Sequence, residues 1–265
     1  MKFPFEEPLY AGRLVRREKR FLAHVTLEDG QDVTAHCANS GSMLGMAEPG
    51  SDVMLRHVPD PKRKLKWTWE LVRPPGEATW IGCNTARPNQ LVAWAIETGQ
   101  VPGLSAADGM RPEQKYGQNS RIDLLLGSED VGLTYVEIKN TTLARSASAP
   151  KATHGRAWKT AKDVHAGYPV GTGPGPHVAT FPDAVTARGA KHMDELAAMV
   201  DAGHQAAVVF FVNRGDCDRF DVARDVDPDY ASAFERAVDA GVRPIPLGMD
   251  VGPDGWRVRR VLSIA

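Results

Sequence analysis

The chain has few cysteines, with only Cys37, Cys83 and Cys217 among its 265 residues. They lie far apart and form neither a CxxC pair nor a Cys/His spacing typical of a zinc site. An odd, sparse set does not support a disulfide framework and suits a reducing compartment. We therefore expect three buried thiols.

The sequence also lacks a long apolar run. The longest, Ala206–Val212, is far too short to span a bilayer. The first residues, Met1-Lys-Phe-Pro-Phe-Glu-Glu-Pro, contain no apolar signal core. We expect a cytoplasmic protein with no membrane partner.

Two further absences narrow the function. The net charge is only -1, so affinity for a polyanion has to come from local basic patches. No GxGxxG, Walker, HExxH or GxSxG motif is present, and Gly41-Ser42-Met43-Leu44-Gly45 lacks the serine spacing of a nucleophile elbow. These absences argue against the common nucleotide-binding, zinc-protease and serine-hydrolase sites.

The most informative stretch is Arg121–Lys139, which reads as a β-hairpin. Apolar runs at Ile122–Leu126 and Leu133–Ile138 flank a polar loop around Asp130. Folding about Asp130 places Asp123 opposite Glu137. The same register puts four apolar residues on one face of the hairpin: Ile122, Leu124, Val136 and Ile138. The other face carries Asp123, Glu137 and Lys139.

An Asp followed about a dozen residues later by Glu-x-Lys is the minimal PD-(D/E)xK nuclease pattern. Directly opposed residues have Cβ atoms roughly 5 Å apart, and two carboxylates that close repel each other unless a cation lies between them. Mg²⁺ or Mn²⁺ suits Asp123 and Glu137 as ligands, with the Ile138 carbonyl as a third, and Lys139 would be the catalytic cation. The competing interpretation is a half-exposed hairpin with a cross-strand ion pair. Taken alone, the Asp and Glu-x-Lys pattern favours this hairpin over a nuclease.

Residues 1–80 predict a small OB-like β-barrel. Five short strands with glycine turns and no long helix are expected, at Leu9–Arg16, Phe21–Leu27, Gln31–His36, Ser51–His57 and Leu65–Val72. Two groups of cations lie in this region, one of them beside Trp67 and Trp69. The candidate nucleic-acid-binding residues are Arg16, Arg17, Lys19, Arg20, Lys62, Arg63, Lys64, Lys66 and Trp67. A solvated hairpin tip with two core tryptophans explains the pattern equally well.

Residues 81–265 predict a mixed-sheet α/β domain. Helices are expected at Thr85–Gln100, capped by Asn84 or Thr85, and at Thr186–Ala202 and Pro228–Ala240. Ala206–Val212 is typical of a buried central strand, and Arg243–Met249 and Trp256–Ile264 complete the sheet. Residues Gln100–Gln114 read as a loop. Arg145–His177 reads as a flexible insertion with more basic than acidic residues. It is either a loop that binds the DNA substrate or a disordered loop without a function in binding.

Three residues outside the hairpin are candidate neighbours of its carboxylates. Glu113 precedes the first hairpin strand, although an isolated Glu near a turn is more often solvated. His192 and Glu195 lie three apart and so share one flank of a predicted helix. That flank faces either the carboxylates or solvent.

Motifs spread over both halves resemble the sugar fermentation stimulation protein family (SfsA). The matching residues are Phe21-Leu-Ala-His-Val25, Asn39-Ser-Gly41, Glu48-Pro-Gly50, Asn84-Thr85, Pro88-Asn89, Glu113, Tyr116-Gly117, Ser120-Arg-Ile-Asp123, Val136-Glu-Ile-Lys-Asn140, Phe181-Pro-Asp183, Thr186, Arg188-Gly189, His192 and Glu195-Leu196. The resemblance implies an OB-like domain, a PD-(D/E)xK-like domain, DNA binding and a link to maltose utilisation. The insertion before Phe181 departs from the usual family pattern.

We therefore expect a DNA-binding protein with a Mg²⁺- or Mn²⁺-dependent phosphodiesterase site. The alternative is a non-enzymatic regulator of sugar metabolism genes that keeps the nuclease fold for binding alone. Retention of Asp123, Glu137 and Lys139 favours catalysis, because a pure binder has no need of a mutually repelling carboxylate pair.

Overall fold

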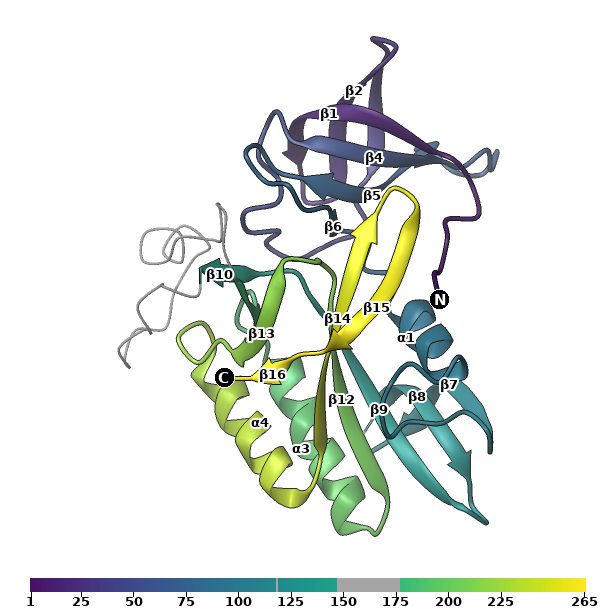
Figure 1. Ribbon diagram of the computed structural model, residues 1–265, viewed down its shortest axis with the longest axis vertical. Coiled ribbons are helices and arrows are strands. Elements are labelled where there is room, and N and C mark those ends of the chain that lie inside the picture. The colour runs from purple at the N-terminus through teal and green to yellow at the C-terminus, as the bar shows by residue number, and fades with distance from the viewer. Residues whose placement is uncertain (118, 147–176) are drawn as a thin grey trace.

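The computed structural model describes residues 1–117, 119–146 and 177–265. A β-barrel forms the upper part of Figure 1, and two further sheets with their helices form the lower part. The β14–β15 hairpin, defined below, extends up toward the barrel (Figure 1). No described helix combines the length and apolar character needed to cross a membrane.

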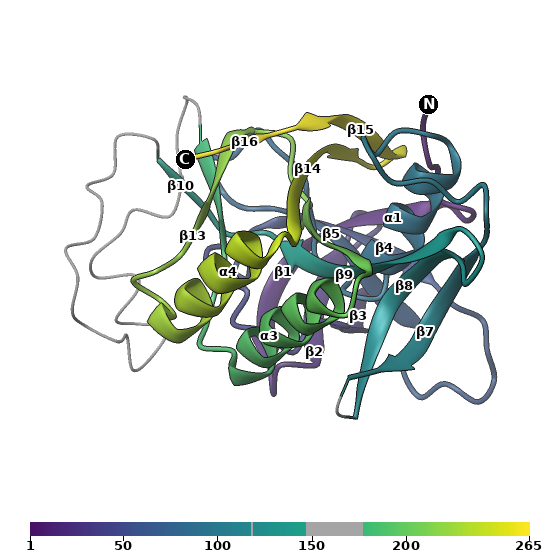
Figure 2. The ribbon, with the colours of Figure 1, turned by 90° about the horizontal axis from the view of Figure 1, so that it is seen from below.

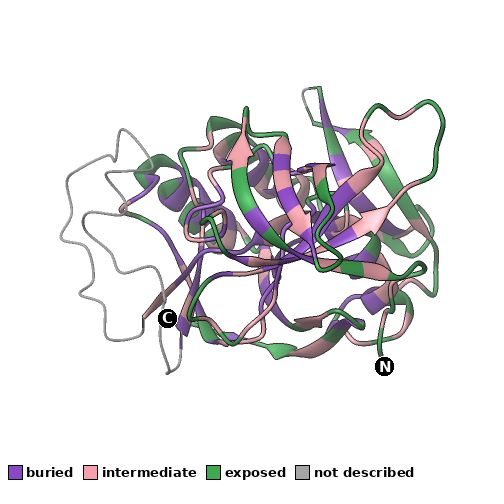
Figure 3. Ribbon diagram, turned by 90° about the horizontal axis from the view of Figure 1, so that it is seen from above, coloured by how far each residue is buried: buried purple, intermediate pink, exposed green. Residues whose placement is uncertain are grey.

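The barrel contains five strands: β1 Leu9–Glu18, β2 Leu22–Leu27, β3 Asp32–His36, β4 Asp52–His57 and β5 Trp67–Arg73. Antiparallel pairing runs in the order β3-β2-β1-β4-β5, and a parallel β3–β5 pairing closes it. Along β2 every second residue is buried, and Figure 3 shows this banding on the barrel strands. Val25, Leu55 and Trp69 fill the interior. The predicted OB-like barrel is confirmed.

A close contact joins the barrel sheet to the rest of the chain. The short strand β6, Ile81–Gly82, pairs with β5 and continues that sheet. Gly82 exchanges two hydrogen bonds with Asn213, whose Nδ2 donates to the Gly82 carbonyl at 3.0 Å. A Cβ at residue 82 would lie 2.2 Å from Asn213 Oδ1, so this approach requires glycine.

The largest sheet in the lower part has the order β15-β14-β12-β9-β8-β7. Its strands are β7 Met110–Tyr116, β8 Ser120–Ser128, β9 Gly132–Thr141, β12 Gln205–Val212, β14 Arg243–Gly252 and β15 Gly255–Val261. β12 lies between β9 and β14, parallel to both, and seven of its eight residues are buried. The predicted central strand is thus confirmed. The predicted loop Gln100–Gln114 is wrong at its end, where edge strand β7 begins at Met110.

Helices cover both faces of this sheet. α3, Ala187–Asp201, and α4, Pro228–Ala240, lie side by side on one face, whereas α1, Pro88–Glu97, lies on the other (Figures 1 and 2). Thr186 and Asp227 cap α3 and α4 by accepting hydrogen bonds from backbone N–H groups. The predicted cap of α1 is wrong. Arg87 occupies that position without a side-chain cap, because Thr85 instead donates to the Ala38 carbonyl.

A second sheet contains β10 Ala144–Ser146, β11 His177–Phe181, β13 Cys217–Val222 and β16 Ser263–Ile264. It corrects the predicted insertion at both ends, because Arg145 lies in β10 and His177 lies in β11. Arg145 also forms an ion pair with Asp225 at 2.9 Å. The other basic residues assigned to the insertion, Lys151, Arg156, Lys159 and Lys162, lie outside the described residues. The three predicted thiols are all free and buried, as expected.

Candidate metal and phosphodiester site

The hairpin of β8 and β9 has the predicted register over residues 124–128, but the expected pairs of Asp123 with Glu137 and Ile122 with Ile138 are not part of the ladder. Leu124 pairs with Val136, and the regular pairing ends there. Beyond this point the Asp123 side chain takes the place of a backbone partner: its Oδ2 accepts from the Ile138 N–H at 2.7 Å. Asp123 Oδ1 accepts from Asn89 Nδ2 on α1 at 2.9 Å. Asp123 is therefore fixed between a strand and a helix.

One part of the predicted facing is wrong. Leu124, Val136 and Ile138 pack together beneath α1, as expected. Ile122 instead joins the cluster on the α3 side, with Leu125. The side-chain alternation thus changes between Ile122 and Leu124, where the Asp123 carboxylate interrupts the regular ladder.

Glu137 lies at the centre of the site. It is 3 % exposed, and its Oε1 accepts from Lys139 Nζ at 2.6 Å and from His192 Nδ1 at 2.6 Å. His192 Nε2 in turn accepts from Arg188 Nε at 3.3 Å, so this network places the imidazole proton on Nδ1. Glu137 Oε2 is buried and receives no hydrogen bond from the described residues. One oxygen of this carboxylate therefore has two donors and the other has none among the described residues.

The two carboxylates differ in their electrostatic balance. Burial, followed by the charge of Glu137, raises the pKa of Asp123 to about 6. Burial also opposes ionisation of Glu137, but His192 and Lys139 hold the pKa of that carboxyl below its ordinary value. Burial, followed by the charges of Glu137, Glu195 and Asp123, raises the pKa of the Tyr116 hydroxyl. The like charges of the two carboxylates therefore oppose each other's ionisation.

The three neighbours proposed from sequence differ in how closely they approach the two carboxylates. His192 contacts Glu137 directly, so the flank of its helix that carries His192 faces the carboxylates and not solvent. Glu195 approaches the backbone near Tyr116: a Cβ at Gly117 would lie 2.9 Å from its Oε1. Glu113 is exposed, with a left-handed φ of 55°, and no hydrogen bond in the described structure joins its side chain to either carboxylate.

A divalent cation fits this arrangement in part. No group of three His, Cys, Asp or Glu side chains among the described residues is arranged to hold a metal by itself. Mg²⁺ commonly binds through one or two carboxylates and fills its other positions with water and phosphate oxygens. Asp123 and Glu137 supply those two carboxylates, and the buried Glu137 Oε2 has an acceptor position to offer. The donor set suits an ion shared with a ligand.

Three residues of this site are not predicted from the sequence. Asn89 binds Asp123, Arg188 binds His192, and the Tyr116 hydroxyl is buried beside the carboxylates without a hydrogen bond in the described structure. All three belong to the motifs that carry the family resemblance. Nothing in their local spacing connects them to the hairpin.

Some candidate nucleic-acid-binding residues have other contacts. Arg17 donates to the backbone carbonyls of Asn39, Gly41 and Ser42, which gives it a structural role. Lys66 Nζ donates to the Asp60 carbonyl, and Arg63 donates to Thr68.

The remaining candidates on the barrel also differ in exposure. Trp67 is half-buried between Tyr10 and His57, whereas Trp69 lies in the core. Five candidate cations are exposed: Arg16, Lys19, Arg20, Lys62 and Lys64.

Comparison with known proteins gives a consistent assignment. Residues 15–83 match the SfsA N-terminal OB domain, and residues 86–166 and 171–255 match the sugar fermentation stimulation protein RE domain. The expected departure from the family pattern before Phe181 is wrong, because most of residues 145–177 fall inside the second match. A sugar fermentation stimulation protein homolog of Rhodospirillum centenum is 47 % identical over 265 residues, covering 100 % of both chains. The homolog from Ruegeria pomeroyi is 44 % identical, covering 97 % of this chain and 99 % of its own.

A solved structure agrees with these matches at the level of the fold. The structure of Pyrococcus furiosus SfsA in complex with Ca²⁺ superposes with a TM-score of 0.76 at 21 % identity, covering 100 % of this chain and 99 % of its own. The described fold and both family models point the same way. The chain belongs to the sugar fermentation stimulation protein family.

Proposed function

We propose that the chain is a Mg²⁺- or Mn²⁺-dependent phosphodiesterase acting on DNA. The observation that carries this proposal is the half-buried Asp123 with the buried Glu137, with Lys139 beside Glu137 and with Glu137 Oε2 without a hydrogen bond from the described residues. A purely structural carboxylate at this depth would have both oxygens satisfied.

The metal would be held by Asp123 and Glu137, with the Ile138 carbonyl as the third ligand predicted from sequence. When bound, it would polarise a phosphate and lower the pKa of a bound water. Asn89 and the Ile138 N–H hold the Asp123 carboxylate in one orientation. Preorganised ligands of this kind need little rearrangement when a charged substrate binds.

Lys139 and His192 both orient the Glu137 carboxylate, and Lys139 has a second role. Both donate to Glu137 Oε1 and leave Oε2 as its open acceptor. The Lys139 ammonium is also the cation placed to stabilise negative charge that develops on a phosphate at this point. Arg188 fixes the tautomer of His192, so its influence reaches the carboxylate through the imidazole.

DNA as the substrate is supported by the barrel. OB-folds commonly bind oligonucleotides, and exposed cations neutralise phosphates. The relatives' name, sugar fermentation stimulation protein homolog, favours a second candidate function, a non-enzymatic DNA-binding regulator of sugar (maltose) metabolism genes.

Cleavage of labelled single- and double-stranded DNA in Mg²⁺ or Mn²⁺ tests the proposal. We expect metal-dependent cutting by the wild type and a loss of at least about 100-fold in Lys139→Ala and Asp123→Ala, the scale of removing one preorganised electrostatic group. Glu235→Ala, at an exposed ion pair, is the matched control and should cut normally. Binding without cutting, equal in all four proteins, would instead support the regulator.

The barrel surface is tested separately by salt dependence. Reversing the exposed Lys62 and Lys64 to Glu should weaken DNA binding and flatten the plot of log affinity against log salt, by about 0.7 for each lost phosphate contact on a single strand. Arg17 should be left intact, because it holds a loop. A slope that does not change would remove this cluster from the binding surface.

A further inference from the structure

A second site lies where a barrel loop meets the lower sheets. It is a cavity of about 270 Å³, separate from the carboxylate pair. Its walls come from the barrel loop after β3, the segment between β6 and α1, the end of β9 with the residues after it, and the end of β11 with the residues after it. The lining residues are Asn39, Ser40, Gly41, Thr85, Asn140, Thr141, Thr142, Leu143, Thr180, Phe181 and Asp183.

The barrel wall of this cavity is held in place from both sides. Arg17 donates to the carbonyls of Asn39 at 2.7 Å and Gly41 at 3.1 Å. Asn39 Oδ1 accepts from the Gly41 N–H at 2.9 Å, which tightens the turn. Ser42 then donates to Asp183 Oδ2 at 2.8 Å, across 141 positions of sequence. The loop is thereby joined to the opposite wall.

The opposite wall is equally fixed. Asn140 Oδ1 accepts from Asn213 Nδ2 at 3.2 Å, and Asn213 also binds the Gly82 carbonyl and Trp256 Nε1. A preformed pocket loses less conformational entropy when a ligand binds. Several motifs that carry the family resemblance meet at this cavity. Most of the motif residues that line it are not part of the candidate metal site.

The chemistry of the lining favours a neutral ligand. Among the described residues its polar groups are amides, hydroxyls and the carboxylate of Asp183, and none of the described lining residues is Lys, Arg or His. A lone carboxylate without a facing cation repels phosphate but accepts hydrogen bonds from amino groups. Leu143 and Phe181 add apolar surface. Small-molecule sites combine apolar surface and polar groups in this way.

The position of the cavity links it to the candidate metal site. β9 carries Glu137 and Lys139 and continues directly into Asn140 and Thr141 of the cavity wall. A strand rises about 3.3 Å per residue, so Thr141 lies about 7 Å beyond Lys139 along β9. A ligand in the cavity therefore lies beside any phosphodiester held at Lys139.

We propose that this cavity receives an unpaired nucleobase from the strand whose phosphate occupies the Asp123–Lys139 site. The inference rests on the proposed function, because that function brings the strand to β9. Asp183 accepts a hydrogen bond from an exocyclic amino group, as carboxylates do when they recognise cytosine. The amide and hydroxyl groups of Asn140 and Thr142 contact the remaining edge of the base.

Binding of single-stranded oligonucleotides tests this site without requiring cleavage. Fluorescence anisotropy in Mg²⁺, read before any cutting, compares strands of each base with a strand carrying an abasic position. We expect the wild type to bind the best base about tenfold more tightly than the abasic strand. Asp183→Asn and Ser40→Ala should reduce or redirect that preference and leave affinity for the abasic strand unchanged.

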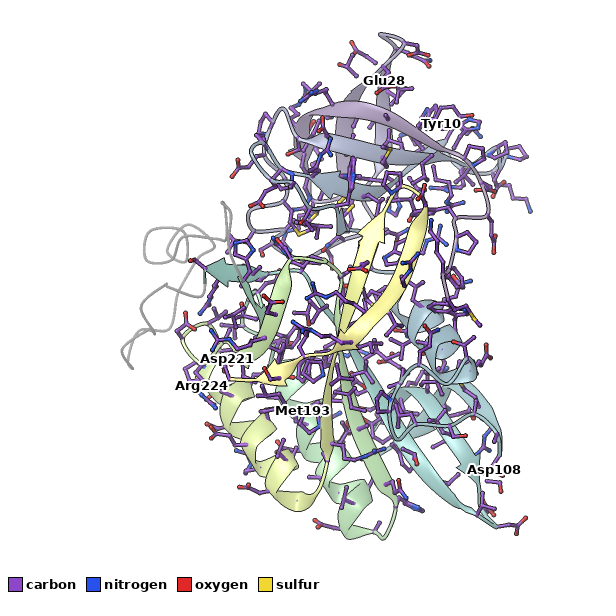
Figure 4. All side chains as sticks on the ribbon, in the orientation of Figure 1. Tyr10, Glu28, Asp108, Met193, Asp221 and Arg224 are labelled. Atoms are coloured by element: carbon purple, nitrogen blue, oxygen red, sulfur yellow. The ribbon has the colours of Figure 1, made fainter. Side chains whose placement is uncertain are left out.

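Asp108→Asn is the matched control, since Asp108 is exposed and lies at the far end of the lower part from the barrel (Figure 4). Ser40 is exposed, so its substitution should not unfold the protein, and melting curves verify this for each variant. Equal binding of base-bearing and abasic strands by the wild type would overturn the inference. A base preference that Asp183→Asn and Ser40→Ala leave intact would also overturn it. A competition assay adds a third outcome: a preference abolished by an added free sugar, but not by an added free nucleoside, would overturn the inference as well.

The outcomes separate this inference from the proposed function. Metal-dependent cleavage without any base preference would overturn the inference alone. Base preference that Asp183→Asn alters, in a protein that never cuts DNA, would support the inference and overturn the hydrolytic function. No binding of any oligonucleotide would overturn both.

Discussion

Two buried glutamates, Glu70 in the barrel and Glu137 in the lower sheet, have opposite surroundings. Glu70 is fully buried, and both of its oxygens are saturated. Its Oε1 accepts from Arg56 at 2.9 Å and Arg87 at 3.0 Å, while its Oε2 accepts from Asn84 at 2.9 Å and Arg87 at 3.1 Å. Glu137 has donors at only one oxygen.

The difference separates a carboxylate that the fold saturates from the one that the proposed function assigns to a metal. Burial opposes ionisation of Glu70, but Arg87 and then Arg56 and Asn84 hold its pKa below the ordinary value, and these bonds join the barrel to the start of α1. Around Glu137 a second carboxylate, Asp123, adds negative charge and has its pKa raised. A complete set of donors fixes two parts of a fold together. An incomplete set beside a like charge leaves a place for a cation.

The largest effect on stability is expected at Glu70. Glu70→Ala leaves the Arg87 guanidinium partly buried without its charge partner, and breaking such a buried pair costs about 3–5 kcal/mol of unfolding free energy. Urea denaturation measures the loss. Glu235→Ala, at a half-exposed ion pair, should cost less than about 1 kcal/mol. A Glu70 variant as stable as this control would refute the structural assignment.

The second effect depends on pH. The pKa of Asp123 is raised to about 6, above its value in an unfolded chain. Its contribution to stability is therefore fully present below about pH 4 and is lost as pH rises through about 6. In EDTA, the unfolding free energy of Asp123→Asn relative to that of the wild type should rise by up to about 3 kcal/mol between pH 4 and 8. Thermal melting across this range measures the gain, with Asp108→Asn as the control, and a difference independent of pH would contradict the raised pKa.

The smallest effect is expected for Glu137→Gln without metal. Glutamine keeps an acceptor for Lys139 and His192 and removes the repulsion with Asp123, so these changes offset each other. We expect the unfolding free energy in EDTA to change by less than about 1 kcal/mol, within the range of a single hydrogen bond. Glu70→Gln should cost clearly more. If the two substitutions cost the same, the contrast between saturated and open carboxylates has no energetic basis.

The elements predicted well from sequence carry strong local signals. α4 has the predicted bounds because Asp227, Pro228 and Gly241 mark its ends. β12 is an uninterrupted apolar run, and the hairpin register follows from the loop around Asp130. The Asp123, Glu137 and Lys139 set was accessible because all three residues lie on one hairpin.

The elements predicted poorly depend on distant partners. β7 lies at the edge of its sheet, contains Pro112, and of its residues only Tyr116 is buried, so it lacks the alternation that indicates a strand. Asn89 reaches Asp123 across 34 residues, and Ser42 reaches Asp183 across 141. Thr85 was expected to cap a helix but binds the barrel loop at Ala38 instead. Contacts of this kind appear only when the barrel and the lower sheets come together.

Calorimetric titration with Mg²⁺ and with Mn²⁺ tests the central contrast most directly. The wild type should bind the ion, Asp123→Asn and Glu137→Gln should lose that binding, and Glu70→Gln should retain it at a temperature where it is folded. This result would establish the open carboxylate pair as a cation site. Absence of binding in the wild type at millimolar metal, or equal binding in Glu137→Gln, would contradict it.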